Sequence, residues 1–138
     1  MGGLQGGQMQ IEIIIPRGMV TMKSVAWGGK AVEEFASSCE AIRHAVQTSE
    51  HREQLKEWLE SRTRLRLHVE FHLCKQRVSH LDIDSLLSDL FNPLVEGACG
   101  PRPEGKPIPQ TKDALFWHVE AVKIEAQGEK TICVITPL

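Results

Sequence analysis

Two aspartates separated by one residue, Asp82 and Asp84, are the residues of this chain best suited by type and spacing to chemistry. They stand at the predicted start of an apolar helix, after a well-formed predicted strand. Asp113 precedes another predicted strand and could join them at the same end of a sheet. Carboxylates from different elements repel one another unless a hard cation such as Mg²⁺ neutralises them through oxygen ligands. Such ions activate water and stabilise a leaving oxygen, as phosphodiester cleavage requires.

The same aspartate pair has a simpler structural explanation. Both carboxylates could cap the helix, because exposed amide groups and the helix dipole favour negative charge at a helix start. In that case the chain is a small domain of another class and holds no metal there. A metal-binding measurement separates the two interpretations.

The elements predicted around these aspartates alternate between strands and helices. Hydrophobic periodicity predicts strands over 10–15, 65–73, 115–125 and 130–136, and helices over 31–46, 52–60 and 82–94. The last two strands form a predicted hairpin, and Trp117 alternates onto the predicted core face with Leu115 and Val119. The sequence therefore predicts one α+β domain over 10–138, with a mixed sheet of about four strands in β-α-β-α-β-β order and helices packed on it. The Gly- and Gln-rich residues 1–9 are interpreted as a disordered tail or remnant.

Histidines and basic residues gather around the 65–73 strand. Arginines and lysines outnumber the single acid Glu70 between 62 and 80, which is typical of a solvated strand face but also suits a local anion-binding patch. His68 and His72 share the polar face roughly 13 Å apart, too far to bind one metal together. His80 and His118 each lie near an expected carboxylate. Each could serve as a metal ligand or as a group that faces phosphate.

Composition limits the class of protein. The 138 residues, 15.5 kDa, 41% hydrophobic and 25% charged, are ordinary for one globular domain. No apolar run approaches the roughly 18 residues of a membrane span, and no secretory leader is recognisable, so a cytoplasmic location without membrane contact is expected. The net charge of −2 argues against a protein that coats nucleic acid by bulk electrostatics. The four widely spaced cysteines are expected to be free thiols.

The stretch 65–134 resembles the RusA-like Holliday junction resolvases. Their pattern is a strand, a basic connector, Asp-x-Asp-Asn-Leu-x-Lys opening a helix, a loop, then an Asp opening a strand that carries a Lys before the final strand pair. The matching pieces here are 67–72, 75–77, 82–88, 113–114, Lys123 and 130–135. The resemblance implies a homodimeric, Mg²⁺-dependent endonuclease (Mn²⁺ also serving) that resolves Holliday junctions or other branched DNA in recombination and repair.

Under this resemblance the metal-binding catalytic carboxylates correspond to Asp82, Asp84 and Asp113. The residues expected to contact DNA phosphates are the basic ones near them: Lys75, Arg77, Arg66 and Lys112.

Two positions depart from the family pattern. Ser85 stands where the family has Asn, and Ser88 where it has a Lys that would place positive charge near the scissile phosphate. A long loop over 97–112 carries basic residues that could replace that charge. The alternative is therefore a member of the same fold that binds DNA or a protein without turnover.

Overall fold

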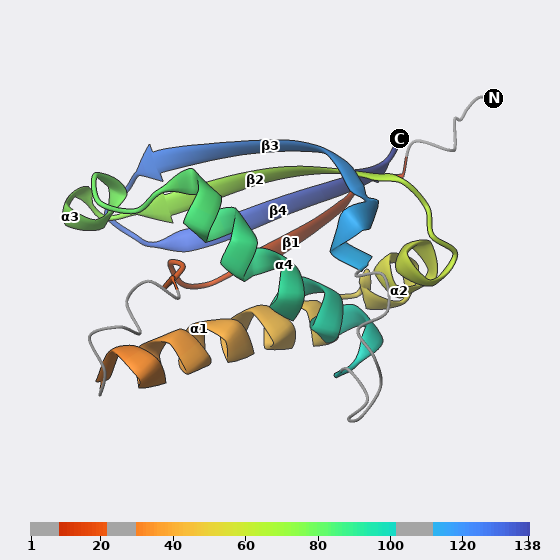
Figure 1. Cartoon of the computed structure of the whole chain (residues 1–138), viewed down its shortest axis with the longest axis horizontal. Helices are drawn as coiled ribbons and strands as arrows, with labels where there is room; N and C mark the ends of the chain where they lie inside the picture. Colours follow the sequence, from red (N-terminus) through yellow and green to blue (C-terminus); the bar gives the residue numbers. More distant parts are fainter. Residues whose placement is uncertain (1–8, 22–29, 102–111) are drawn as a thin grey trace.

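A four-stranded mixed sheet forms one layer of the structure, and helices packed on one of its faces form the other (Figure 1). The computed structural model describes residues 9–21, 30–101 and 112–138. The strands are β1 (Ile11–Ile15), β2 (Leu65–Leu73), β3 (Phe116–Glu125) and β4 (Lys130–Pro137). The helices are α1 (Lys30–Gln47), α2 (Arg52–Glu60), α3 (Lys75–Val78), α4 (Ile83–Cys99) and the short 3₁₀ helix η3 (Lys112–Leu115). The predicted α+β class and element order are confirmed.

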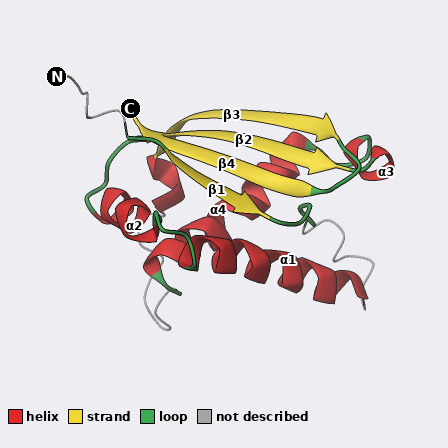
Figure 2. Ribbon diagram, turned by 180° about the vertical axis from the view of Figure 1, so that it is seen from behind, coloured by secondary structure: helices red, strands yellow, loops and turns green. Residues whose placement is uncertain are grey.

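The strand order in the sheet is β1-β4-β2-β3. β4 runs antiparallel to both β1 and β2, whereas β2 and β3 are parallel neighbours. The parallel pair needs a crossover, and α4 provides it (Figure 2). In β2 every second residue, from Leu65 to Leu73, is fully buried beneath the helices, while the residues between them face away. The alternation shows that one face of β2 is covered, and its neighbours β4 and β3 make it an inner strand.

The predicted hairpin of the last two strands is wrong, because β2 lies between β3 and β4. The short link from β3 to β4 crosses over the carboxyl end of β2. It is held there by backbone and side-chain bonds: Ala126 N–H donates to Leu73 O at 2.9 Å, and Cys74 N–H donates to Glu129 Oε2 at 2.9 Å. A turn signal between two strands does not reveal whether a third strand lies between them in the sheet.

Helices α1 and α4 pack closely against each other. A Cβ atom added at Gly97 would lie 2.7 Å from Val46 Cβ and 2.9 Å from Arg43 O, so the crossing depends on a residue without a side chain. An ion pair between Arg43 and Glu96, at 3.1 Å, joins the same two helices nearby. α4 continues through the buried Pro93 to Cys99, five residues beyond the predicted end.

The core lies between the covered face of the sheet and these helices. Its largest fully buried side chains come mainly from β1, β2, α1, α2 and α4, and Ile135 of β4 is also fully buried. Among them are Ile11, Ile15, Ile42, Leu55, Leu59, Leu67, Phe71, Leu86 and Leu90. Leu115 is buried as predicted, but from η3 instead of a strand. No helix in the described ranges is long and apolar enough to cross a membrane.

Candidate metal and nucleic-acid site

Asp82 and Asp84 lie at the start of α4, as the sequence indicates. Asp82 occupies the N-cap position with extended backbone angles, φ −80° and ψ 140°, but its side chain makes no cap hydrogen bond. Asp84 lies in the first turn, where the helix dipole favours an acidic residue. Both residues are exposed. The capping explanation therefore does not account for the Asp82 side chain, although the dipole suits Asp84.

Lys123 of β3 is hydrogen-bonded to the turn that directly precedes Asp82. Its Nζ donates to Val78 O at 2.7 Å and to Leu81 O at 2.9 Å, so the last backbone carbonyl before Asp82 is held by a strand. Lys123 pairs in register with the buried Phe71, which places it on the helix-covered side of the sheet. The sequence resemblance contains this lysine but does not indicate its role. A lysine at an inward position of a strand needs hydrogen-bond acceptors, and this requirement was the signal in the sequence that could have indicated the role of Lys123.

Asp113 does not stand at the same end of the sheet as the other two aspartates. In the parallel pair, Leu65 aligns with Phe116 and Leu73 with Glu125. Asp82 follows the end of β2, whereas η3 precedes the start of β3, and the nine residues of β2 separate these ends by roughly 27 Å. Figure 1 shows the start of α4 beside α3 and η3 at the opposite end. The expectation of a shared sheet end is wrong for the backbone, and the Asp113 side chain lies outside the described residues.

The geometry decides what kind of metal site is feasible. Among the described residues there is no group of three or more His, Cys, Asp or Glu side chains that could hold an ion. A cage made entirely of these protein groups is therefore excluded for the described part of the chain. Mg²⁺, however, usually retains water and is held by one or two carboxylates together with substrate phosphates. Exposed Asp82 and Asp84 fit that second mode.

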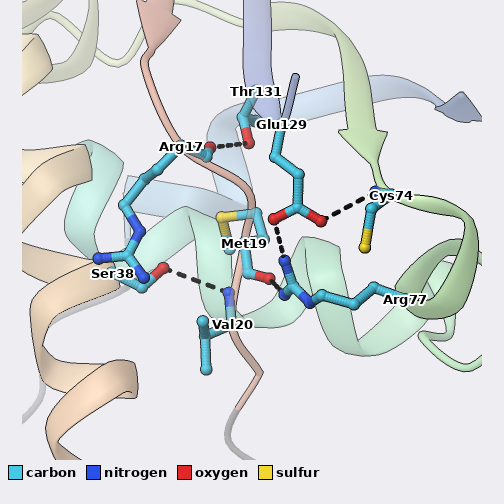
Figure 3. Close-up of polar contacts among 8 residues, drawn as sticks. All are labelled: Arg17, Met19, Val20, Ser38, Cys74, Arg77, Glu129 and Thr131. Carbon is cyan, nitrogen blue, oxygen red and sulfur yellow. Dashed lines mark hydrogen bonds and ion pairs between the residues drawn. The ribbon is translucent and has the colours of Figure 1, made fainter. Parts of the chain in front are cut away.

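The four predicted phosphate contacts differ in their surroundings. Lys75, the first residue of α3, is exposed near the aspartates. Arg66 is exposed near the opposite end of β2, and Lys112 lies outside the described side chains. Arg77 is engaged within the protein: its guanidinium pairs with Glu129 at 2.5 Å and also donates to Met19 O (Figure 3). Arg77 therefore has a structural role that its spacing in the sequence does not reveal.

Glu129 contacts several chain segments at this end of the sheet. Burial alone would raise the pKa of its carboxyl, but the hydrogen bond from Cys74 N–H and the charge of Arg77 outweigh burial and lower the pKa below its ordinary value. Gly18 passes so close that a side chain there would collide with the Glu129 carboxylate. Thr131 Oγ1 donates to Arg17 O at 3.3 Å beside it (Figure 3). The cluster thus joins the segment after β1 to the β3–β4 link.

The open face of the sheet carries a chain of alternating carboxylates and imidazoles. Glu120 bonds His68 at 2.7 Å, His68 lies 3.7 Å from Glu70, and Glu70 bonds His72 at 2.9 Å. The hydrogen bond with His72 is the main reason that the pKa of Glu70 is lowered. His68 and His72, which share the polar face of β2, are thus linked through Glu70.

Trp117 is exposed instead of buried, with 63% of its surface accessible. A register irregularity between β2 and β3 pairs Leu65 with Phe116 but Arg66 with His118, so Trp117 is an extra residue on β3. Phe116 occupies the buried position, and its ring packs against that of Phe91 with the two ring centroids 5.4 Å apart. A bulge of this kind shifts the alternation and redirects a side chain. The two remaining candidate histidines, His80 and His118, are exposed.

Ser88, the position where the resemblance expects a lysine, is exposed one helical turn beyond Asp84. None of the four cysteines forms a disulfide, which agrees with the expected thiols. No protein-family model matches the chain, and a search of curated proteins finds no match.

Proposed function

We propose that the protein is a metal-dependent endonuclease of Holliday junctions or other branched DNA, with Asp82 and Asp84 as the carboxylates that hold the metal. The observation that carries this proposal is the start of α4. Two exposed aspartates stand on a rigid helix, and the Asp82 side chain is not used as a cap. The resemblance to RusA-like resolvases supplies the reaction class.

In this proposal the ion binds together with the DNA. Mg²⁺ or Mn²⁺ held by these carboxylates supplies activation of water and charge stabilisation at the phosphate. The chain's own contribution is orientation, because Lys123 fixes the carbonyls of Val78 and Leu81 just before Asp82. Exposed Lys75 on α3 provides a phosphate contact nearby. Asp113 is not needed for this two-carboxylate mode.

A second candidate is a DNA-binding protein of the same fold without turnover. Two observations support this second candidate. Ser88 cannot supply the positive charge expected one turn from Asp84, and the backbone at Asp113 lies at the far end of the sheet. Under this candidate the protein holds branched DNA and leaves it intact.

The deciding experiment measures metal binding and junction cleavage for Asp82→Asn, Asp84→Asn and a control. Calorimetry with Mn²⁺, with and without a four-way junction, is expected to show tighter metal binding when DNA is present and loss of that binding in both variants. Cleavage of the labelled junction is expected to be lost in parallel. Glu53→Gln, which removes a first-turn acid from α2, controls for the helix-dipole effect and should change neither measurement.

The outcomes separate the candidates. DNA-dependent metal binding without cleavage supports the binding protein. Absence of metal binding in the wild-type protein, with or without DNA, overturns the metal site and leaves a resemblance of fold alone.

A further inference from the structure

The region around the start of β2 and β3 forms a surface that the metal site does not use. Its centre is Trp117, whose ring lies 4.5 Å from the Arg64 guanidinium carbon. Arg66 and His118 face each other across the two strands just beyond it. We call Arg64, Arg66, Trp117 and His118 the platform. All four residues are exposed.

Trp117 is not required by the core. Phe116 already fills the buried position next to Phe91, and the extra residue in β3 directs the larger ring outward. At 63%, Trp117 is the most exposed large hydrophobic side chain in the described part of the chain. The exposed indole does not stabilise the core, so its ring is available to contact a ligand.

The charge around Trp117 favours an anionic ligand. Two arginines and a histidine belong to the platform, and Arg62 precedes them on the same segment. The acids on the neighbouring rows of the sheet are already engaged with histidines: Glu120 bonds His68 and Glu70 bonds His72. The Arg64 guanidinium lies over the Trp117 ring, and its N–H groups are of the kind that donate to phosphate oxygens.

A flat ring beside arginines is complementary to an unpaired nucleotide. Bases of a single strand offer an open π-face for stacking, while their phosphates pair with Arg. Bases inside a duplex are already stacked on both sides and cannot use the ring. We propose that the platform binds single-stranded DNA, with an unpaired base on Trp117 and the adjoining phosphate on Arg64. This extends the proposed function, since branched DNA such as a flap carries a single-stranded segment, but it does not depend on the metal or on cleavage.

The test measures binding of a short fluorescein-labelled oligothymidylate by anisotropy in EDTA. Trp117→Ala is expected to weaken binding by about fivefold or more, because stacking of one base contributes at least that much. Trp117→Phe should recover most of the loss. Arg64→Ala is expected to weaken binding and lower its dependence on salt. Lys30→Ala, which removes an exposed cation from α1, is the matched charge control and should change little.

An abasic oligonucleotide of equal length separates stacking from charge attraction. The wild-type protein is expected to prefer the thymidine strand, and Trp117→Ala to bind both strands equally. Equal binding of both strands by the wild-type protein, or a duplex bound as tightly as the single strand, overturns the proposal. Asp82→Asn should bind like the wild type in EDTA, so failure of the metal site leaves this result unaffected. A thermal melt confirms that each variant is folded.

Discussion

At the scale of single residues, the ionised Glu129 is expected to stabilise the fold. Its carboxylate is mostly buried, with 24% exposed, and it accepts bonds from Cys74 N–H and Arg77. The pKa of Glu129 lies below its ordinary value of 4.5 in the folded protein, so its contribution is present above that pH and is lost as the pH falls through the lowered pKa. The ion pair therefore protects the fold at neutral pH and fails in acid.

We predict that Glu129→Gln lowers the free energy of unfolding by about 1–2 kcal/mol at pH 7, because it leaves the Arg77 charge without its partner. The difference between variant and wild type should shrink as the pH falls below 4.5. Urea unfolding at several pH values measures both effects. Glu60→Gln, at an exposed position on α2, is the control and should show neither. A difference independent of pH would contradict this account of the ion pair.

A second prediction at this scale concerns Ser88. A lysine there would lie one turn beyond Asp84 on the exposed side of α4, within reach of a phosphate bound at the carboxylates. Under the proposed nuclease function, Ser88→Lys is expected to raise the rate of junction cleavage by about tenfold or more, since charge stabilisation of this kind contributes a few kcal/mol. Ser79→Lys, an exposed serine after α3, controls for added charge alone. Equal gains in both variants would contradict a specific role for position 88.

The residues themselves show what a sequence can and cannot reveal. Asp82 and Asp84 were placed correctly because strand and helix periodicity bracket them. Trp117 was misplaced because the irregularity between Leu65 and Arg66 gives the buried position to Phe116 and leaves Trp117 as the extra residue, whereas Val119 beyond it keeps the predicted face. The composition carries no mark of the bulge. The structural pairing of Arg77 with Glu129 joins residues far apart in the chain, and spacing gives no sign of it.

At the scale of elements, the contact between α1 and α4 depends on Gly97. We predict that Gly97→Ala lowers the free energy of unfolding by about 1–2 kcal/mol, although alanine is the better helix former, because its Cβ would press on Val46 Cβ and Arg43 O. Gly128→Ala is the control, since a Cβ there meets nothing within 4 Å, and it should change stability by less than about 0.5 kcal/mol. Denaturant unfolding of both variants provides the comparison, and equal stabilities would mean that the helices separate at little cost.

Most elements were predictable, whereas their pairing was not. The alternation in 65–73 and the apolar stripe of 82–94 are local signals, and the structure has a strand and a helix there. The end of α4 was missed because Gly97 and the Gly and Pro residues that follow it read as a loop, whereas the helix continues through Gly97 to Cys99. The supposed hairpin and the position of Asp113 depend on strand order and direction, which follow from the whole sheet and not from any one segment.

At the scale of the whole molecule, the proposed function requires two equivalent sites. A junction is cut at two related positions, and a two-fold dimer supplies both. The apolar stripe of α1 offers little surface for such a dimer, because Ile42 and Val46 are buried within the chain and mainly Val32 is exposed. The helix therefore serves the core of its own chain.

We predict that sedimentation velocity gives about twice the 15.5 kDa mass of the chain when a four-way junction is absent. Dilution over a wide concentration range should shift the distribution toward the single chain. The control is the same measurement on Gly128→Ala, whose surface change is minimal. A mass near that of one chain at every concentration would count against paired sites.

The position of β4 in the sheet has a consequence for how the chain is made. β4 lies between β1 and β2, yet it follows both in the sequence, and its register joins Ile11 to Ile135. During synthesis β1 and β2 emerge from the ribosome without the strand that separates them, and they have no direct pairing with each other. The sheet can close only when the final strand has been released. Because β1 pairs only with β4, we expect β1 to join the sheet late, after β4 has been made.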